Sequence, residues 1–182
     1  MKYIRLFEDW KKERIGQGFE HDVYPFRLKP DWVIKKFIAD EELYDLDDWQ
    51  EMLAVSKDHP DLFAKIGKVD LERGYFVQER LDERSLTRDS RELAQRLIEQ
   101  GVDLSIGDIF VHLYLNPGDI GVLDRAEDDP LVPKILRFFG RLRSAGFGPG
   151  RMYLGDIRLS NLGYDRTGEI KVLDFNFTSE YE

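Results

Sequence analysis

Hydrophobic and polar positions in the first half of the chain follow the pattern of short β-strands. Residues 23–28 and 32–38 are rich in β-branched and aromatic side chains, and Lys29-Pro30-Asp31 between them has the composition of a turn. We therefore expect a β-hairpin, preceded by a strand over residues 13–19. Two further strands are predicted at residues 64–69 and 74–80, joined by a polar turn.

Other segments follow a helical period. In residues 41–57 the apolar side chains fall on one face and the acids on the opposite face. Residues 89–100 and 130–146 are predicted helices that end at Gly101 and Gly146. The remaining predicted elements are a lead-in helix or turn at 4–15, a helix at 106–115, and strands at 162–164 and 170–173. A β-rich first half and a helical second half predict an α+β fold with a cleft between two lobes.

The length of 182 residues allows one domain, which we place at residues 1–182. Within it we expect an N-terminal lobe at 1–80 and a reduced C-terminal lobe at 81–182. Hydrophobic residues make up 42% of the chain, enough to build a core. The formal net charge of −9 disfavours nucleic acid and anionic membrane surfaces as partners, because both need a surplus of Lys and Arg.

The sequence gives only indirect indications of the compartment in which the protein acts. The chain has no cysteine, which fits a reducing compartment. Residues 1–9 carry acids where a signal peptide needs an apolar run, and no stretch approaches the roughly 20 apolar residues of a membrane span. We expect a cytoplasmic protein, or one that a dedicated machine secretes into a host cell.

A glycine turn near the N-terminus is a candidate phosphate-binding loop. Gly16 and Gly18 lack a Cβ, so backbone N–H groups can approach phosphate oxygens closely, and Val23 follows at the spacing of a glycine-rich loop. His21 stands where the third glycine of such a loop belongs. A Gly-x-Gly sequence is also common in ordinary hairpin turns.

Lys35 ends the apolar run Trp32-Val33-Ile34 and is the candidate phosphate-binding lysine. Strand alternation turns Lys35 inward and Lys36 to solvent, and a shift of register by one residue exchanges the two roles. A glutamate on the following helix would hold the lysine in place. Glu51 is our candidate, with Glu41, Glu42 and Asp48 as nearby alternatives.

The strand around residues 75–81 has the character of an adenine-binding hinge. Main-chain groups at Glu79 and Leu81 would read the base, which places no requirement on their side chains. Any buried strand would show the same pattern.

Asp156 and Asn161 form the pattern D-x-x-x-x-N, and Asp174 follows after a predicted hairpin. This spacing places the Asp156 carboxylate near an attacking hydroxyl and the Asn161 amide on a magnesium ion. Asp174 would be the second metal ligand. Alternatively, Asp156 caps a turn and Asp174 ends an ordinary strand.

These segments together resemble the protein-kinase-like family from Ile15 to Asn176, and in particular the minimal kinases of bacterial effectors and phages. The resemblance implies an antiparallel β-sheet and one helix in the N-terminal lobe, and a truncated, mainly helical C-terminal lobe. It implies that Lys35 anchors phosphate, that Asp156 is the catalytic base, and that Asn161 and Asp174 bind magnesium.

The sequence departs from the family pattern at several points. The H-R-D triplet is Leu154-Gly155-Asp156 here, Asn176 replaces the glycine after Asp174-Phe175, and an A-P-E motif is missing. We therefore do not expect control by phosphorylation of an activation loop. The Gly-Asp form is also similar to that of small-molecule phosphotransferases of the same superfamily.

The resulting hypothesis is an ATP- and Mg²⁺-dependent kinase of protein Ser or Thr residues, acting as a monomer. A small-molecule kinase, enclosing its substrate with residues 84–130, is the first alternative. A nucleotide-binding pseudokinase or interaction module is suggested by His21 and Asn176. Transfer of AMP is a further alternative that no residue specifically favours.

Overall fold

A computed structural model describes residues 14–17, 21–37, 46–104, 109–148, 153–155, 157–174 and 176–178. The chain divides into two compact units. The first unit is drawn from residues up to 58 together with 64–80, and the second from 59–63 together with residues from 81 onward. Residues 59–63 thus group with the second unit, and the division into lobes at 1–80 and 81–182 stays a prediction. That the whole chain is one domain stays a prediction.

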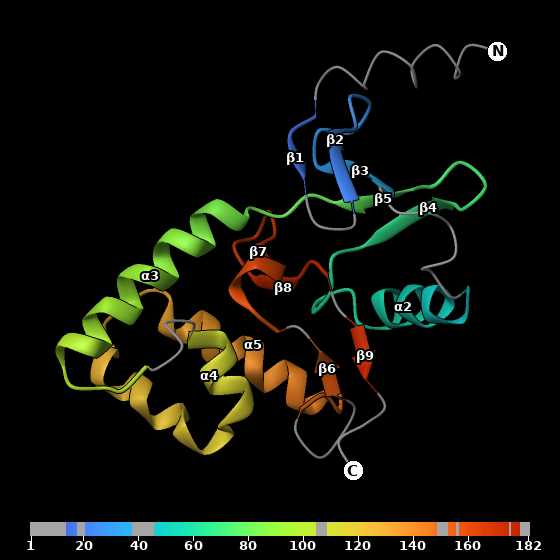
Figure 1. Cartoon of the computed structure of the whole chain (residues 1–182). Coiled ribbons are helices and arrows are strands. Elements are labelled where there is room, and N and C mark those ends of the chain that lie inside the picture. The colour runs from blue at the N-terminus through green and yellow to red at the C-terminus, as the bar shows by residue number, and fades with distance from the viewer. Residues whose placement is uncertain are drawn as a thin grey trace. The chain divides into compact units, whose positions relative to one another are not determined.

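The first unit is built on a five-stranded sheet in the order β1-β2-β3-β5-β4, in which every neighbouring pair is antiparallel (Figure 1). The strands are β1 (Gly16–Gln17), β2 (His21–Pro25), β3 (Trp32–Phe37), β4 (Ile66–Asp70) and β5 (Tyr75–Glu79). All five fall within or next to predicted strands. β1 is shorter than predicted within the described residues, because residues 18–20 lie outside them.

The turn between β2 and β3 is longer than predicted. The Lys29 N–H donates to the Phe26 carbonyl at 2.9 Å, and the Trp32 N–H donates to the Lys29 carbonyl at 2.9 Å. These bonds close the backbone on itself, so β2 ends at Pro25 and not at residue 28 as predicted. The tight turn takes precedence over the strand propensity of residues 26–28.

One face of this sheet carries its own small apolar core. Tyr24, Ile34, Tyr75 and Val77 are buried together, with Phe26 and Trp32 packed against them. The four buried residues are register partners or near neighbours on β2, β3 and β5, as the two-residue period of strands requires.

Helix α2 (Leu46–Asp58) belongs to the same unit. Its last turn is tied to the segment that enters β4. The buried Ser56 hydroxyl donates to the Ala64 carbonyl at 2.9 Å and accepts from the Ile66 N–H at 3.2 Å. These two bonds satisfy the Ser56 hydroxyl, which is buried with 3% of the residue surface exposed.

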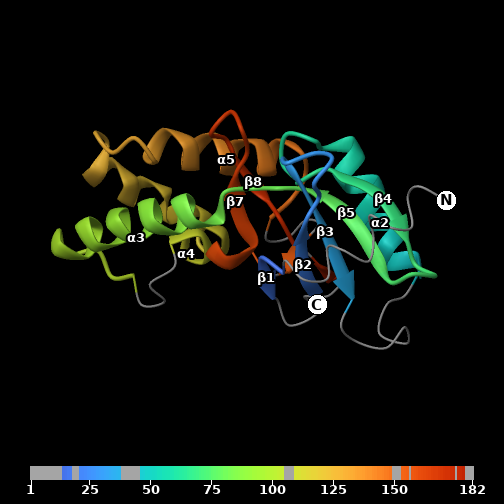
Figure 2. The ribbon, with the colours of Figure 1, turned by 90° about the horizontal axis from the view of Figure 1, so that it is seen from above.

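The second unit is mainly helical. It contains α3 (Glu83–Glu99), α4 (Ile109–Leu115), the 3-10 helix η3 (Pro117–Ala126) and α5 (Val132–Ser144). A shorter 3-10 turn, η4 (Leu159–Asn161), leads into the hairpin of β7 (Leu162–Tyr164) and β8 (Ile170–Val172). Figure 2 shows this hairpin beside the N-terminal end of α3. Inside the helical layer, Phe110, Phe138 and Phe139 form a cluster of ring contacts at 5.3–6.2 Å between centroids.

Helix α3 begins six residues before the predicted start at Asp89. Its N-cap is Asp82, whose side chain accepts a hydrogen bond from the Ser85 N–H at 3.1 Å. An aspartate at this position satisfies one of the N–H groups that a helix leaves open at its start. The predicted start was wrong because residues 83–89 are mostly polar or charged, and Leu86 alone among them continues the helical period of apolar residues.

Four elements in the described part of the second unit were not predicted: the 3-10 helices η3 and η4, and the two strands β6 (Tyr153–Gly155) and β9 (Asn176–Thr178), which pair with each other. Each of these strands has only three residues, too few to show a period of two. Their pairing joins residues on either side of the β7–β8 hairpin.

The observed architecture confirms the α+β class, with an antiparallel sheet and one helix in the described part of the first unit and a mainly helical second unit. Over the described residues, no helix combines the length and the apolar character that crossing a bilayer demands.

Candidate functional site

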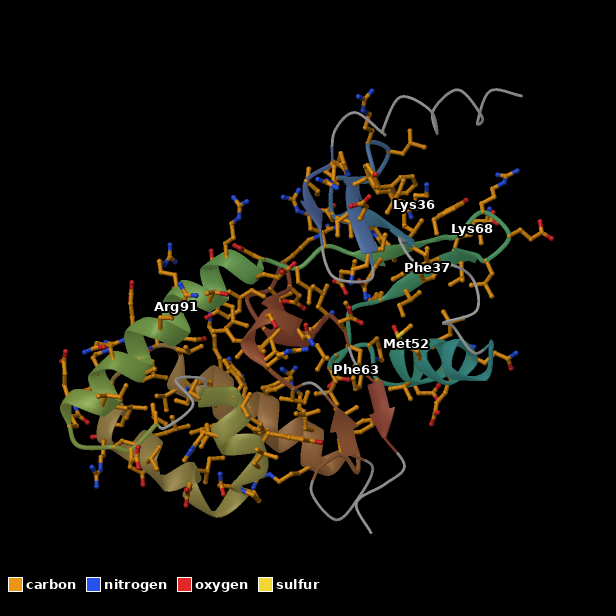
Figure 3. The ribbon with its side chains drawn as sticks, in the orientation of Figure 1. Lys36, Phe37, Met52, Phe63, Lys68 and Arg91 are labelled. Carbon is orange, nitrogen blue, oxygen red and sulfur yellow. The ribbon has the colours of Figure 1, made fainter. Side chains whose placement is uncertain are left out.

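Lys35 lies in the middle of β3, between Val23 on β2 and Phe76 on β5. Its side chain is buried, with 5% of its surface exposed, and its ammonium lies 5.8 Å from the centre of the Phe76 ring. Lys36, the next residue, is half-buried and pairs in register with Tyr75 on the other face; Figure 3 labels it beside Phe37. Side chains of β3 therefore alternate between the two faces of the sheet as predicted, with Lys35 turned inward.

The glycine turn is described only in part. Gly16 pairs in register with Val23, and the Ile15 N–H donates to the Val23 carbonyl at 2.9 Å. A Cβ added to Gly16 would lie 3.6 Å from the Val23 Cβ, which is an ordinary contact. The sheet itself thus has no need of a glycine here. Gly18 lies outside the described residues.

Glu51, the predicted partner of Lys35, is an exposed residue of α2. Among the described residues it makes no ion pair or hydrogen bond. The structure therefore does not bring Glu51 and Lys35 together, and their pairing stays a prediction. Glu41 and Glu42 lie outside the described residues.

The predicted hinge residue Glu79 is bonded to the main chain of Lys65 through both its backbone and its side chain. The Glu79 N–H donates to the Lys65 carbonyl at 2.8 Å, and the Lys65 N–H donates to a Glu79 carboxylate oxygen at 3.1 Å. Because its N–H is engaged in the sheet, Glu79 would have to contact a base through its carbonyl.

Leu81, the second predicted hinge residue, begins the second unit and is buried. In the described part of the chain its N–H has no hydrogen-bond acceptor. The next residue, Asp82, pairs with Tyr164: the Asp82 N–H donates to the Tyr164 carbonyl at 2.8 Å, and the Tyr164 N–H donates back at 3.3 Å. The linker into α3 is therefore attached to β7.

Asn161 and Asp174 lie at the same end of the β7–β8 hairpin. Leu162 pairs with Val172, and the ladder extends one step further, where the Leu173 N–H donates to the Asn161 carbonyl at 2.7 Å. Asp174 follows Leu173 directly, and both candidate side chains are half-buried. The hairpin thus brings the predicted metal ligands together through main-chain bonds. Asp156 lies outside the described residues.

The hairpin is fastened to the helices of its own unit. Glu169 accepts hydrogen bonds from Arg137 at 2.8 Å and from Arg141 at 3.0 Å, both on α5. The hydrogen bond from Arg137, with the charges of Arg137 and Arg141, lowers the pKa of Glu169 below its ordinary value. On α3, Asp89 accepts from the Tyr164 hydroxyl at 3.0 Å. Burial, and then this hydrogen bond, raise the pKa of Tyr164.

Gly163 was not among the predicted site residues. A Cβ added to it would lie 2.6 Å from the Leu81 Cβ and 3.3 Å from the Glu83 nitrogen, too close for either to remain in place. An isolated glycine inside a strand is the signal that could have identified such a close approach. It links the predicted hinge residue Leu81 to the strand that follows Asn161.

The described residues of the second unit line hollows, two of which bear on a site. One, of about 140 Å³, is a mainly apolar cavity lined by residues of α4, η3 and α5, among them Tyr114 and Phe139, and by Phe147, which follows α5. The other, of about 570 Å³, is an open depression along the first turns of α3 that includes Ser160 of η4. Its lining residues include charged side chains of both signs, although much of the surface that they present to it is apolar, and the exposed Arg91 is one of them (Figure 3).

Magnesium prefers oxygen ligands, and a protein often supplies only one or two of them when substrate phosphates supply others. Asn161 and Asp174 offer an amide and a carboxylate from the same end of one hairpin, and the chemistry of these two groups fits such an ion. Over the described residues, no cluster of three His, Asp or Glu side chains suited to holding a metal is found. A metal would thus depend on the bound phosphates for the rest of its ligands.

The sequence matches no family model and no curated protein. Among solved structures, the chain is similar to the crystal structure of the choline kinase LicA from Streptococcus pneumoniae, with 16% sequence identity and a TM-score of 0.42. The aligned region covers 91% of this chain and 64% of that protein, so the chain spans less than two thirds of the neighbour's length. We base no functional conclusion on a likeness of this size.

Proposed function

We propose that the protein is a phosphotransferase that moves the γ-phosphoryl group of ATP, bound with Mg²⁺, to a Ser or Thr hydroxyl of a protein substrate. The observation that carries the proposal is the hydrogen bond from the Leu173 N–H to the Asn161 carbonyl. It sets an amide and the carboxylate of Asp174 at one end of a hairpin, in the sequence pattern that magnesium-dependent phosphoryl transfer uses.

Lys35 supports the same proposal from the first unit. Its side chain is buried in the centre of the sheet, at the strand position of a phosphate-binding lysine. Gly16 lies on the same sheet, paired with Val23, which is itself the register partner of Lys35. That the sheet does not itself need a glycine at position 16 is consistent with a role in ligand approach.

The transfer step is an in-line displacement. The acceptor oxygen forms a bond to the γ-phosphorus, the bond from that phosphorus to the β–γ bridging oxygen breaks, and ADP leaves. We assign to Asp156 the role of accepting the proton of the attacking hydroxyl. Magnesium, when bound, neutralises charge on the transferring phosphates; Asn161 and Asp174 would hold it.

The open depression beside Ser160 favours a protein acceptor. Small-molecule sites are concave, mostly apolar and bury most of their ligand. The depression along α3 is open and does not enclose a ligand, and Ser160, which lines it, directly precedes the proposed metal ligand Asn161. An extended polypeptide fits such a surface better than an enclosed metabolite does.

A small-molecule acceptor is the second candidate. The specific observation in its favour is that the segment proposed to enclose such a substrate, residues 84–130, is largely helical, with α3, α4 and η3 in the same unit as the hairpin. The two candidates differ in what carries the label after reaction, a protein or a metabolite.

The proposal is tested by incubating the purified protein with γ-labelled and with α-labelled ATP, alone and with a cell lysate. Label from γ-ATP on Ser or Thr residues is expected, and α-label is not. Asp156→Ala should abolish transfer and leave ATP affinity nearly unchanged, because this carboxylate acts on the acceptor. Asp174→Ala should reduce transfer by roughly 10²–10³-fold and also weaken the Mg²⁺-dependent part of ATP binding.

Different outcomes point to different functions. Transfer of α-label would indicate a nucleotidyltransferase, and γ-label found only on metabolites would select the small-molecule kinase. ATP binding without any transfer, unchanged in Asp174→Ala, would indicate a nucleotide-binding module. Asp124→Ala, an exposed carboxylate of η3, is the matched control and should behave as the unmodified protein.

A further inference from the structure

The linker into α3 passes close to the β7–β8 hairpin at Gly163. A methyl group at this position would lie 2.6 Å from the Leu81 Cβ, 3.3 Å from the Glu83 nitrogen and 3.4 Å from the Asp82 carbonyl carbon. Carbon atoms pack at about 3.5–4.0 Å, so one of the two segments would have to move by about 1 Å. The nearest atom belongs to the root of a side chain, which no rotamer change can move.

This contact is reinforced on both sides. Asp82 and Tyr164 exchange main-chain hydrogen bonds at 2.8 and 3.3 Å, and the Asp82 side chain caps α3 through the Ser85 N–H. Two residues before Gly163, the Asn161 carbonyl is bonded to the Leu173 N–H. The linker at Leu81 and the metal-ligand end of the hairpin are therefore parts of one bonded assembly within the second unit.

We propose that Gly163 is a positioning residue that sets the Leu81 main chain at the right place to bind the base of the nucleotide. This inference rests on the proposed function, since it takes Leu81 as a hinge residue and Asn161 as a metal ligand. Without a side chain at position 163, the linker lies directly against β7. The Leu81 N–H, which has no acceptor in the described part of the chain, then faces the base at a fixed distance from the metal site.

The proposal separates two parts of nucleotide affinity. The base is read by the linker, whereas the phosphates are held through the metal at Asn161 and Asp174. A displacement of Leu81 by about 1 Å should affect only the first part, because a misplacement of this size can cost on the order of 10²-fold in a positioned site. Binding of the phosphates should not change, because the β7–β8 pairing and the hydrogen bond from Leu173 to Asn161 hold Asn161 and Asp174 in place.

The test is calorimetric titration of Gly163→Ala with Mg-ATP and, separately, with Mg-tripolyphosphate, which has no base. We expect the Kd for Mg-ATP to rise at least tenfold and the Kd for Mg-tripolyphosphate to stay within about twofold of that of the unmodified protein. Unchanged Kd values for both ligands would overturn the proposal. An equal rise for both would also overturn it, because Gly163 would then matter only to the hairpin as a whole.

A matched control and a rescue variant make the result specific. Gly140 lies in α5, and a Cβ added there meets nothing within 4 Å, so Gly140→Ala should leave both Kd values unchanged. The double variant Leu81→Gly/Gly163→Ala removes the atom at 2.6 Å and should bind Mg-ATP more tightly than the two single changes predict by addition. Simple additivity would count against the proposal.

If Gly163→Ala fails to fold, the double variant decides. Its recovery of a cooperative thermal transition and of Mg-ATP binding would support the contact as the cause, and a double variant that stays unfolded would contradict it. Failure of the proposed function has a different signature, because it is seen in the unmodified protein, which would then either not bind Mg-ATP or bind it without transferring its γ-phosphoryl group.

Discussion

The two units hold their candidate residues in different ways. In the first unit, Lys35 is fixed by burial, surrounded in the sheet by Val23 and Phe76. In the second, Asn161 and Asp174 are half-buried and are fixed by the main chain of a hairpin. Replacing a buried side chain such as that of Lys35 should affect both stability and activity. Replacing a half-buried side chain should affect stability less, because hydrogen bonds between main-chain groups hold the hairpin together.

The second unit adds a set of fastenings that the first does not need. The β7–β8 hairpin is short, with three residues in each strand, and a pair of this length is not stable alone. Contacts of Glu169 with α5 and of Tyr164 with α3 hold it in place. We therefore expect the candidate residues of the two units to respond differently to substitution, to pH and to loss of packing.

The largest effect that separates the units is expected at Lys35. Both Lys35→Ala and Lys35→Met should lower kcat/KM for transfer roughly 100-fold, because neither can bind phosphate. Their stabilities should differ: Ala loses the packing of the buried stem and costs about 1–2 kcal/mol, whereas Met refills that space and retains most of the stability. Steady-state kinetics and urea unfolding measure the two quantities.

Asp174→Ala is the counterpart in the second unit. If the comparison holds, its unfolding free energy changes by less than about 0.5 kcal/mol although transfer is lost. A large loss of stability in Asp174→Ala, or none in Lys35→Ala, would contradict the distinction between burial in one unit and backbone placement in the other.

The same distinction explains how much the sequence could predict. The inward position of Lys35 follows from the two-residue period of a strand, which four or five adjacent residues are enough to show. The pattern D-x-x-x-x-N and the following aspartate point to Asn161 and Asp174 because a hairpin of fixed length lies between them. Both sets depend on local spacing, which a single sequence displays directly.

Other features depend on contacts between distant residues. Glu169 meets Arg137 and Arg141 across 32 and 28 positions of sequence, and Tyr164 meets Asp89 across 75. No local period reveals such pairs. The start of α3 was missed for a related reason: its cap, Asp82, is recognisable only once the linker is known to leave the sheet at Glu79 and turn onto β7.

An intermediate effect is expected from the fastening of the hairpin to α5. The pKa of Glu169 is lowered below its ordinary value near 4.5 by Arg137 and Arg141. A lowered pKa means that the folded state holds the charged form, so this contribution is present above about pH 4.5 and is lost as pH falls through the lowered pKa. Glu169→Gln should therefore cost about 1 kcal/mol at pH 7 and nothing near the acid limit of folding.

Urea unfolding of Glu169→Gln and of the unmodified protein at several pH values measures this difference. Glu127→Gln, a change at an exposed residue next to η3, is the matched control and should show no pH-dependent difference. A Glu169→Gln difference that persists unchanged at low pH would mean that packing, and not the charge, holds the hairpin. Glu169 would then stabilise the protein through packing, as the buried side chain of Lys35 does.

The smallest effect on stability and on transfer is expected from a substitution of Glu51. This substitution tests whether helix α2 helps to position Lys35. Glu51 is exposed and makes no ion pair or hydrogen bond within the described residues, so Glu51→Gln should change stability by less than about 0.5 kcal/mol. Transfer should stay within about twofold, as it should for Glu72→Gln in the turn between β4 and β5. If Glu51→Gln alone lowers transfer tenfold or more, Glu51 meets Lys35 when nucleotide is bound. The first unit would then position its lysine by a mobile helix as well as by burial, and the contrast with the fixed hairpin of the second unit would be sharper still.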